Sequence, residues 1–307
     1  MAEYGYKAYL EVGRLSEQGD YCSYTALPLE LDGWSYTFIR GIDDRGKVST
    51  GLRGGNISFL ISGIPRLLFW EWATETCKYL SGNIIIRNTE GYKINQLHFE
   101  DAACVSMKVK YLNEGKAYMS TEVVLQAEKL YFEGASKPLD NRWPENALYK
   151  IRTLGASATD DLDNLIKSLL GKNLSAITPV VPLEGVFEIE GHPYEIAQFE
   201  ISFLQDVTFN GRPNSQSKGG IATVGLYQLP DNYLNNWMVN TVKKSGEICF
   251  GSELEGYGLN IRYTDAFCMG CHAGTDNYSD ASCVFRFNIL PQTLIIKDIM
   301  FETPYFL

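Results

Sequence analysis

The sequence has few histidines, no excess of basic residues and no long apolar segment. Three histidines occur in 307 residues, and 37 aspartates and glutamates outnumber 27 lysines and arginines, so the formal net charge is −10. This charge argues against a nucleic-acid partner, because a polyanion is bound by a basic surface. No run approaches the roughly 18 apolar residues of a membrane span, and the N-terminal residues lack the basic and apolar regions of a secretory signal. We therefore expect a cytoplasmic protein without membrane insertion.

The cysteines do not suggest a disulfide framework. They number seven and are scattered through apolar segments, which favours buried, reduced thiols. Hydrophobic residues make up 45% and charged residues 21% of the chain, as in ordinary globular proteins. The 13% of aromatic residues and the 28 glycines favour β-structure. At about 150 residues per domain, the length predicts two domains.

An internal repeat divides the chain. Arg53-Gly54-Gly55 precedes an alternating strand pattern, and Lys218-Gly219-Gly220 repeats this arrangement 165 residues later. Further matches at this offset are Pro28 with Pro193, Trp34 with Phe199, Phe38 with Phe203, Gly46 with Gly211 and Trp72 with Trp237. Beyond the helix that follows each glycine pair the offset becomes 164, as between Cys104 and Cys268. A constant offset of this length indicates a duplicated domain.

The repeat predicts two mainly β domains, at residues 1–146 and 184–307, each with one short helix. Residues 1–19 have no sequence counterpart in the second half and predict an extra N-terminal strand or arm. The connector, residues 147–183, is long enough to carry structure of its own. Its apolar residues at helical spacing predict a short amphipathic helix near residues 160–170: Leu162, Leu165, Ile166, Leu169 and Leu170.

Each glycine pair lies where a loop re-enters a strand. Glycine at such a place predicts a bulge, a sharp bend or a close approach of two backbone segments. A phosphate cradle is the alternative, but neither the P-loop lysine motif nor a helix directly after the glycines is present. We therefore expect no phosphate there.

The sharpest local motif is Cys268-Met-Gly-Cys271-His272. C-x-x-C-H is the pattern of c-type haem attachment, and C-x-x-C is also half of a zinc site or a redox pair. The segment repeats a strand of the first half, and residues three apart in a regular strand point to opposite faces, which would separate the thiols. Haem attachment would also need export through a signal peptide. We therefore expect a structural role, with zinc as the second interpretation.

Asp101 and Asp265 match each other at offset 164. One carboxylate per domain favours backbone hydrogen bonding over acid–base chemistry. None of His98, His192 and His272 recurs, which argues against a duplicated histidine-dependent active site. A single Ser/His/Asp arrangement stays open, although no nucleophile elbow or zinc-protease motif is present.

The matched tryptophans Trp72 and Trp237 are interpreted as side chains that fix each helix to its sheet rather than as ligand-stacking groups. We predict no catalytic, cofactor-binding or metal-binding residue and no cofactor. The residues alone therefore indicate a binding or assembly protein rather than an enzyme.

Several short motifs, in this order, resemble the tube protein of the type VI secretion system in its Bacteroidetes form, the Hcp/TssD family. They are Tyr36-Thr-Phe38, Leu52-Arg-Gly-Gly55, Phe69-Trp-Glu-Trp72, Ser81-Gly-Asn-Ile-Ile-Ile86, Leu97-His-Phe-Glu-Asp-Ala-Ala-Cys-Val-Ser106 and Asn141-Arg-Trp-Pro-Glu145. The resemblance covers roughly residues 5 to 146. The second half is similar but weaker, because it keeps Lys218-Gly-Gly220 and lacks the terminal Trp-Pro signature.

The resemblance implies a β-sandwich or barrel with a lateral helix, assembled into stacked hexameric rings that form a hollow tube. It further implies sheath, spike and effector proteins as partners, and secretion through the apparatus itself. Because this chain holds two domains, we expect three chains to form a pseudo-hexamer joined at exposed edge strands. The alternatives are a monomeric ligand- or effector-binding adaptor, favoured by a deep aromatic pocket around Trp70 or Trp237, and an enzyme on a β-sandwich scaffold.

Overall fold

The computed structural model describes most of both predicted domains. The described residues are 5–15, 21–23, 28–39, 53–76, 78–113, 117–141, 143, 183–208, 211–252, 257–273 and 285–303. The predicted connector helix near residues 160–170 lies outside them.

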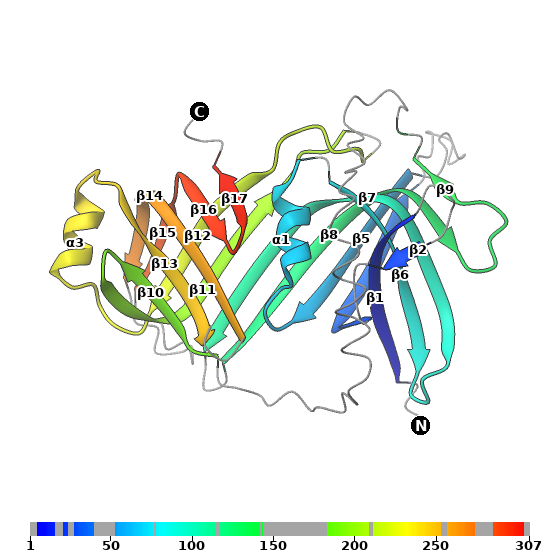
Figure 1. Ribbon diagram of the computed structural model, residues 1–307, viewed down its shortest axis with the longest axis horizontal. Helices are drawn as coiled ribbons and strands as arrows, with labels where there is room; N and C mark the ends of the chain where they lie inside the picture. Colours follow the sequence, from blue (N-terminus) through cyan, green and yellow to red (C-terminus); the bar gives the residue numbers. More distant parts are fainter. Residues whose placement is uncertain are drawn as a thin grey trace, which may run out of the picture.

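Both domains consist mainly of antiparallel strands (Figure 1). The first domain contains β1 (Tyr6–Leu15), β2 (Tyr21–Ser23), β3 (Leu29–Leu31), β4 (Gly33–Ile39), β5 (Arg53–Ser62), α1 (Leu67–Thr74), β6 (Tyr79–Asn88), β7 (Lys93–Asn113), β8 (Ala117–Phe132) and β9 (Leu139–Asp140). The second contains β10 (Gly185–Ile189), β11 (His192–Leu204), β12 (Lys218–Leu226), α3 (Asn232–Val239), β13 (Lys244–Ser252), β14 (Tyr257–Ala273), β15 (Phe285–Leu290), β16 (Thr293–Ile296) and β17 (Ile299–Glu302). The predicted mainly β fold with tandem domains is confirmed.

The sheet of each domain closes on itself. In the second domain β10 pairs with β11 and β13, β12 with β11 and β15, and β14 with β13 and β15. In the first domain β1 pairs with β3 and β6, β5 with β4 and β8, and β7 with β6 and β8. Only Asp32 separates β3 from β4, so these two strands together occupy the place of β11. Each domain is thus a small closed barrel.

The N-terminal strand has a structural counterpart, contrary to the interpretation of residues 1–19 as an addition. Strand β1 lies between β3 and β6 as β10 lies between β11 and β13. The corresponding partners are Leu29 and Ile84 for Leu10, and Tyr194 and Ile248 for Phe187. The offset between Leu10 and Phe187 is 177 rather than 165, because the first domain has a longer segment between β1 and β3.

One helix lies beside each barrel, and a buried tryptophan fixes it there. Trp72 Nε1 donates to the carbonyl of Ala102 on β7 at 3.1 Å. Trp237 Nε1 donates to the carbonyl of Val242 at 3.0 Å, and its ring meets Phe287 of β15 edge-on with centroids 6.2 Å apart. Both indoles are about 1% exposed or less, so the predicted structural role is confirmed. In the described ranges, neither helix has the length and apolar composition needed to cross a membrane.

The two barrels lie side by side and share one hydrophobic cluster. In Figure 1, α1 lies between the barrels, and α3 lies at the end of the molecule far from the first domain. The two equivalent helices thus have different surroundings, because only α1 has a second barrel next to it.

Candidate assembly interface

The two domains are joined by a strand pair. Strand β11 of the second domain runs antiparallel to β7 of the first over seven residue pairs, from Gln198 opposite Leu112 to Leu204 opposite Ser106. The sheet of the first barrel therefore continues into the sheet of the second. We call this strand pair the internal joint.

The inward face of the internal joint is apolar and buried. On β11, Phe199, Ile201 and Phe203 are 0%, 0% and 1% exposed. On β7, Met107 and Val109 are 0% exposed. These side chains alternate with polar ones along each strand, which is the pattern of strands with one buried face.

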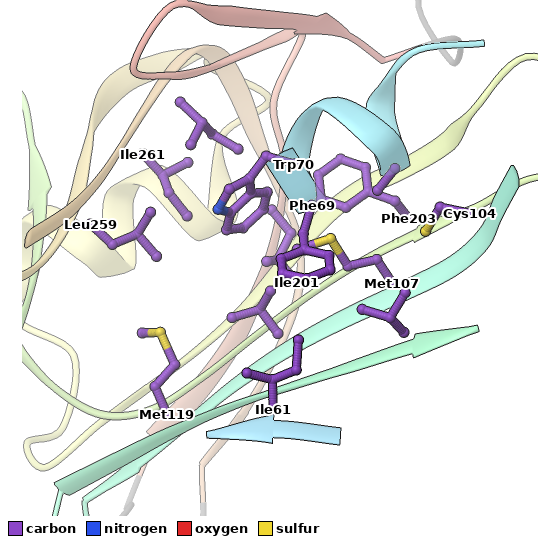
Figure 2. Packing of buried hydrophobic residues seen from close by; sticks show 14 of the residues in the cluster. Ile61, Phe69, Trp70, Cys104, Met107, Met119, Ile201, Phe203, Leu259 and Ile261 are labelled. Atoms are coloured by element: carbon purple, nitrogen blue, oxygen red, sulfur yellow. The ribbon is translucent and has the colours of Figure 1, made fainter. Parts of the chain in front are cut away.

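Helix α1 of the first domain covers this face (Figure 2). Figure 2 shows Phe69 and Trp70 of α1 next to Ile201, Phe203 and Met107. The rings of Trp70 and Phe203 meet edge to face, with centroids 6.0 Å apart and an interplanar angle of 88°. Aromatic pairs in this arrangement stabilise beyond the area that they bury.

The second domain also satisfies the open carbonyls at the end of α1. The last carbonyls of a helix have no partner within the helix. Ser217 Oγ donates to the carbonyl of Ala73 at 2.6 Å, and Gln205 Nε2 donates to that of Glu75 at 3.3 Å. The backbone N–H of Gln205 donates to the carbonyl of Val105 at 2.9 Å. The internal joint is therefore specific in register as well as apolar.

On the outward face an ion pair crosses the internal joint. Lys108 Nζ lies 2.8 Å from Glu200 Oε1, and Lys110 Nζ lies 4.0 Å from Glu200 Oε2. All three side chains are more than a third exposed, and exposed ion pairs of this kind stabilise little. These ion pairs therefore contribute to the orientation of the two strands rather than to the stability of the joint.

The glycine pairs are positions of close backbone approach. Gly54 and Gly219 have φ angles of 120° and 128°, and both lie at a bulge in their own strand, β5 and β12 respectively. A Cβ on Gly219 would lie 2.2 Å from the carbonyl oxygen of Ser202 on β11, and one on Gly54 would lie 2.8 Å from Thr37 O on β4. The predicted bulge and close approach are confirmed in both domains.

Asn141, the first residue of the terminal signature, closes the end of the first barrel. Its Nδ2 donates to the carbonyl of Gly54 at 2.6 Å and to that of Ala127 at 2.8 Å. In the second domain Thr303 occupies this place, with its hydroxyl against the carbonyls of Pro291 and Gln292. The signature thus links the last strand to the glycine pair.

Replacing Asn141 by alanine should therefore destabilise the chain. Gln126 Nε2 also donates to the carbonyl of Gly54, at 2.7 Å, so the buried bond to Ala127 is the main loss, and a buried carbonyl without its donor costs about 1–3 kcal/mol. We expect the free energy of unfolding in urea to fall by about 2 kcal/mol. Asn95→Ala is the control, because Asn95 lies in an exposed segment where a change stays within about 0.5 kcal/mol. Equal effects of the two substitutions would contradict this role.

Two strand edges equivalent to the internal joint have no strand partner in the described part of the chain. Strand β4 corresponds to β11 and pairs only with β5, and the end of β14 corresponds to β7 and pairs there only with β15. The correspondence is fixed by matching pairs, since Met107 lies opposite Val123 as Cys271 lies opposite Phe287, 164 residues later. We call these the β4 edge and the β14 edge.

Both edges carry apolar side chains that are uncovered in the single chain. Tyr36 and Phe38 on β4 are 41% and 44% exposed, whereas their counterparts Ile201 and Phe203 are buried. Cys271 is exposed on β14, whereas its counterpart Met107 is buried. An open groove of about 370 Å³ runs beside β4, lined by Gly33, Trp34, Ser35, Ser58, Phe59, Leu60 and Glu122. Exposed apolar patches on a strand edge are typical of an interaction surface.

The two thiols of the C-x-x-C motif lie on the same face of β14, which corrects the prediction that the strand separates them. A bulge between Cys268 and Gly270 adds one residue, so that Cys268 lies opposite Ile289 and Cys271 opposite Phe287. Ile289 and Phe287 are two residues apart and share the buried face of β15. The expected structural role for the segment agrees with its position in a strand.

The matched aspartates have a conformational role. Asp101 and Asp265 adopt φ angles of 47° and 50°, a left-handed conformation that aspartate tolerates better than most residues. Their backbone N–H groups make equivalent hydrogen bonds. Asp101 N donates to Ser81 Oγ at 3.2 Å, and Asp265 N donates to Ser245 Oγ at 3.1 Å. These contacts agree with the predicted backbone role.

The histidines lie in separate places. His98 Nδ1 lies 2.8 Å from Asn83 Oδ1, the ring of His192 stacks on Tyr233 with centroids 4.0 Å apart, and His272 lies on the β14 edge. Within the described ranges no three side chains of His, Cys, Asp and Glu gather in a way that could hold a metal ion. Trp70, like Trp237, is 1% exposed and leaves no ring face open to a ligand.

The comparison with protein families finds one match, which occurs twice. The family of the hemolysin coregulated protein Hcp (TssD) matches residues 4–144 and again residues 183–304. No curated protein matches the chain. The two matched segments agree with the two barrels.

Solved structures with similar folds include Hcp1 from Flavobacterium johnsoniae, with 18% identity and a TM-score of 0.36 over 39% of this chain and 99% of that one. Hcp1 from Salmonella typhimurium has 12% identity and a TM-score of 0.27 over 44% of this chain and 91% of its own. A chain of the anti-feeding prophage baseplate has 9% identity and a TM-score of 0.28 over 43% of this chain and 94% of its own. Each of these alignments spans less than half of this chain.

Proposed function

The chain belongs to the Hcp (TssD) family, and from this premise we propose that three copies close into a ring of six similar barrels, which stacks into the tube of a type VI secretion apparatus. The internal joint is the observation that carries the proposal. It shows how one barrel of this chain joins another, and the same two surfaces recur, uncovered, at the β4 edge and the β14 edge.

The uncovered edges are complementary in register. The repeat offsets transfer the residue pairing of the internal joint to the two uncovered edges. In this pairing Phe38 of one copy lies opposite Cys271 of the next, as Phe203 lies opposite Met107. Thr37 then faces His272, as Ser202 faces Lys108. The same transfer places α3 over the joint between chains, in the position that α1 occupies over the internal joint. In Figure 1, α3 lies at the free end of the molecule that this arrangement requires.

Such a contact is head to tail, because the two surfaces that meet are different. Head-to-tail contacts repeat until they close into a ring or continue as a helix. With two barrels per chain, three chains supply six positions. The ring would have three internal joints and three joints between chains.

The proposed role is structural rather than catalytic. The polar face of the continuous sheet would line a central channel, and effectors, sheath and spike proteins would be its partners. Passage through the apparatus itself would take the protein out of the cell. The family match and the duplicated joint support this role.

Native mass spectrometry of the full chain tests the ring directly. We expect a species of three 34.5 kDa chains, and electron microscopy should show six barrels in one layer. A chain that stays monomeric at high concentration would contradict the proposal and favour an adaptor that keeps the fold without forming tubes. Six chains in one layer would contradict the pseudo-hexamer.

A further inference from the structure

We propose that Asn235 on α3 sets the strength of the joint between chains and makes it weaker than the internal joint. The ring would then assemble and open reversibly at its three joints between chains. The inference rests on the proposed ring and adds to it the residue that determines how tightly the ring closes.

In the internal joint, Trp70 is the side chain that anchors α1 to the second barrel. It is 1% exposed, and its ring meets that of Phe203 edge to face. In Figure 2 its indole also points toward Ile261 and Leu259 of β14, which are 0% and 2% exposed. Large aromatic side chains that are fully buried at the centre of an interface carry much of its binding energy.

Helix α3 has an amide side chain at the equivalent position. Asn235 matches Trp70 at offset 165 and is exposed in the single chain. The two helices have the same orientation on their barrels, since the preceding residues Leu234 and Phe69 are both 1% exposed. Asn235 Nδ2 donates to the carbonyl of Pro230 at 3.3 Å, toward the start of its own helix. The joint between chains therefore lacks the aromatic anchor of the internal joint.

The surface that would receive α3 lacks two further contacts of the internal joint. Leu259 corresponds at offset 164 to Asn95 of β7, which is exposed. Ser217, whose hydroxyl donates to the carbonyl of Ala73, corresponds at offset 165 to Leu52, whose side chain has no donor. Apolar and hydrogen-bonding contacts are thus both reduced on the side of the joint that faces α3.

The difference agrees with the time for which each surface is in contact with water. The internal joint forms as the chain folds, whereas α3 and the β4 edge are uncovered in every free chain. Permanent interfaces are more apolar than those whose partners also exist apart. A tryptophan at position 235 would enlarge the exposed apolar surface that Val239 and Val242, 83% and 50% exposed, already form near the end of α3.

Replacing Asn235 by tryptophan tests the inference. The indole would lie against Phe38 of the next copy, as Trp70 lies against Phe203. We expect the concentration at which half of the rings dissociate to fall by at least about tenfold, because an aromatic contact is added at each of three joints. Native mass spectrometry over a dilution series measures this concentration. Mixing rings of normal and heavy-isotope chains should show that chains exchange more slowly in the variant.

Two variants control for effects of the added ring elsewhere. Asn236→Trp adds the same side chain to α3 one residue along, at the counterpart of Glu71, which pairs with Lys78 within its own domain. It should leave the dissociation concentration unchanged. Asn235→Trp combined with Phe38→Asp should stay monomeric, because the indole stabilises the ring only through the β4 edge.

The outcomes separate this inference from the proposed function. If neither the unmodified chain nor Asn235→Trp forms rings, both fail. If only Asn235→Trp forms rings, the inference holds and the proposed function of the natural chain fails. If the unmodified chain forms rings and Asn235→Trp does not tighten them, or Asn236→Trp tightens them equally, only this inference is overturned. Rings of the combined variant would overturn it as well.

Discussion

Replacing Phe38 by aspartate is expected to abolish ring formation while the chain stays folded. Phe38 is 44% exposed in the single chain, so the carboxylate can remain in water there. Its ring lies 6.0 Å from Tyr36 and 6.3 Å from Phe132, and loss of these contacts costs about 1 kcal/mol. In the ring the same carboxylate would be buried against the next copy without a partner. An unpaired buried charge costs about 3–5 kcal/mol, which weakens each joint by roughly 100-fold or more.

The measurement is the mass of the assembly at a concentration where the unmodified chain forms rings. Tyr92→Asp is the matched control, because Tyr92 is 68% exposed in the turn between β6 and β7, away from both edges. Phe203→Asp makes the same change at the equivalent position of the internal joint. There it should reduce folding stability instead, because Phe203 is 1% exposed in the single chain. Rings of the Phe38→Asp chain would refute the proposed use of the β4 edge.

Among alanine substitutions in the two glycine pairs, Gly219→Ala is expected to reduce folding stability the most. Its φ of 128° is unfavourable for any residue with a Cβ, and the Cβ would lie 2.2 Å from the backbone oxygen of Ser202. The backbone of a paired strand cannot move aside, whereas the end of a flexible side chain can. We expect the free energy of unfolding to fall by about 3–5 kcal/mol in urea titrations.

Gly134→Ala is the control for the conformational part of this effect. Gly134 also has a positive φ, 84°, but a Cβ there would meet nothing within 4 Å. Its replacement should cost about 1 kcal/mol, the usual penalty of a left-handed conformation. If both substitutions destabilise equally, the close approach to Ser202 is not what requires glycine at position 219.

The sequence predicts the duplication and the meaning of the glycine pairs, because both depend on local patterns at a constant offset. Repeat matching misses the counterpart of β1, since the longer segment between β1 and β3 moves Leu10 out of register with Phe187. It also misplaces the thiols of Cys268 and Cys271. Their relative orientation depends on a bulge, which no alternation pattern announces.

The candidate site is harder to predict than the fold. The alternation of Trp34, Tyr36 and Phe38 is that of an ordinary strand with one buried face, and exposed edge strands are expected as joints only in general terms. What distinguishes this strand is that its apolar face stays open while the equivalent face of β11 is closed by β7 and α1. That difference depends on contacts between residues about 100 positions apart in the chain.

The internal joint also fixes the order of the barrels. In a ring of separate single-barrel chains every position is equivalent, whereas in the proposed ring the first and second barrels must alternate in equal numbers. A protein that docks on the ring would therefore meet threefold and not sixfold symmetry. Exposed residues that differ between the barrels would recur at every second position around the ring.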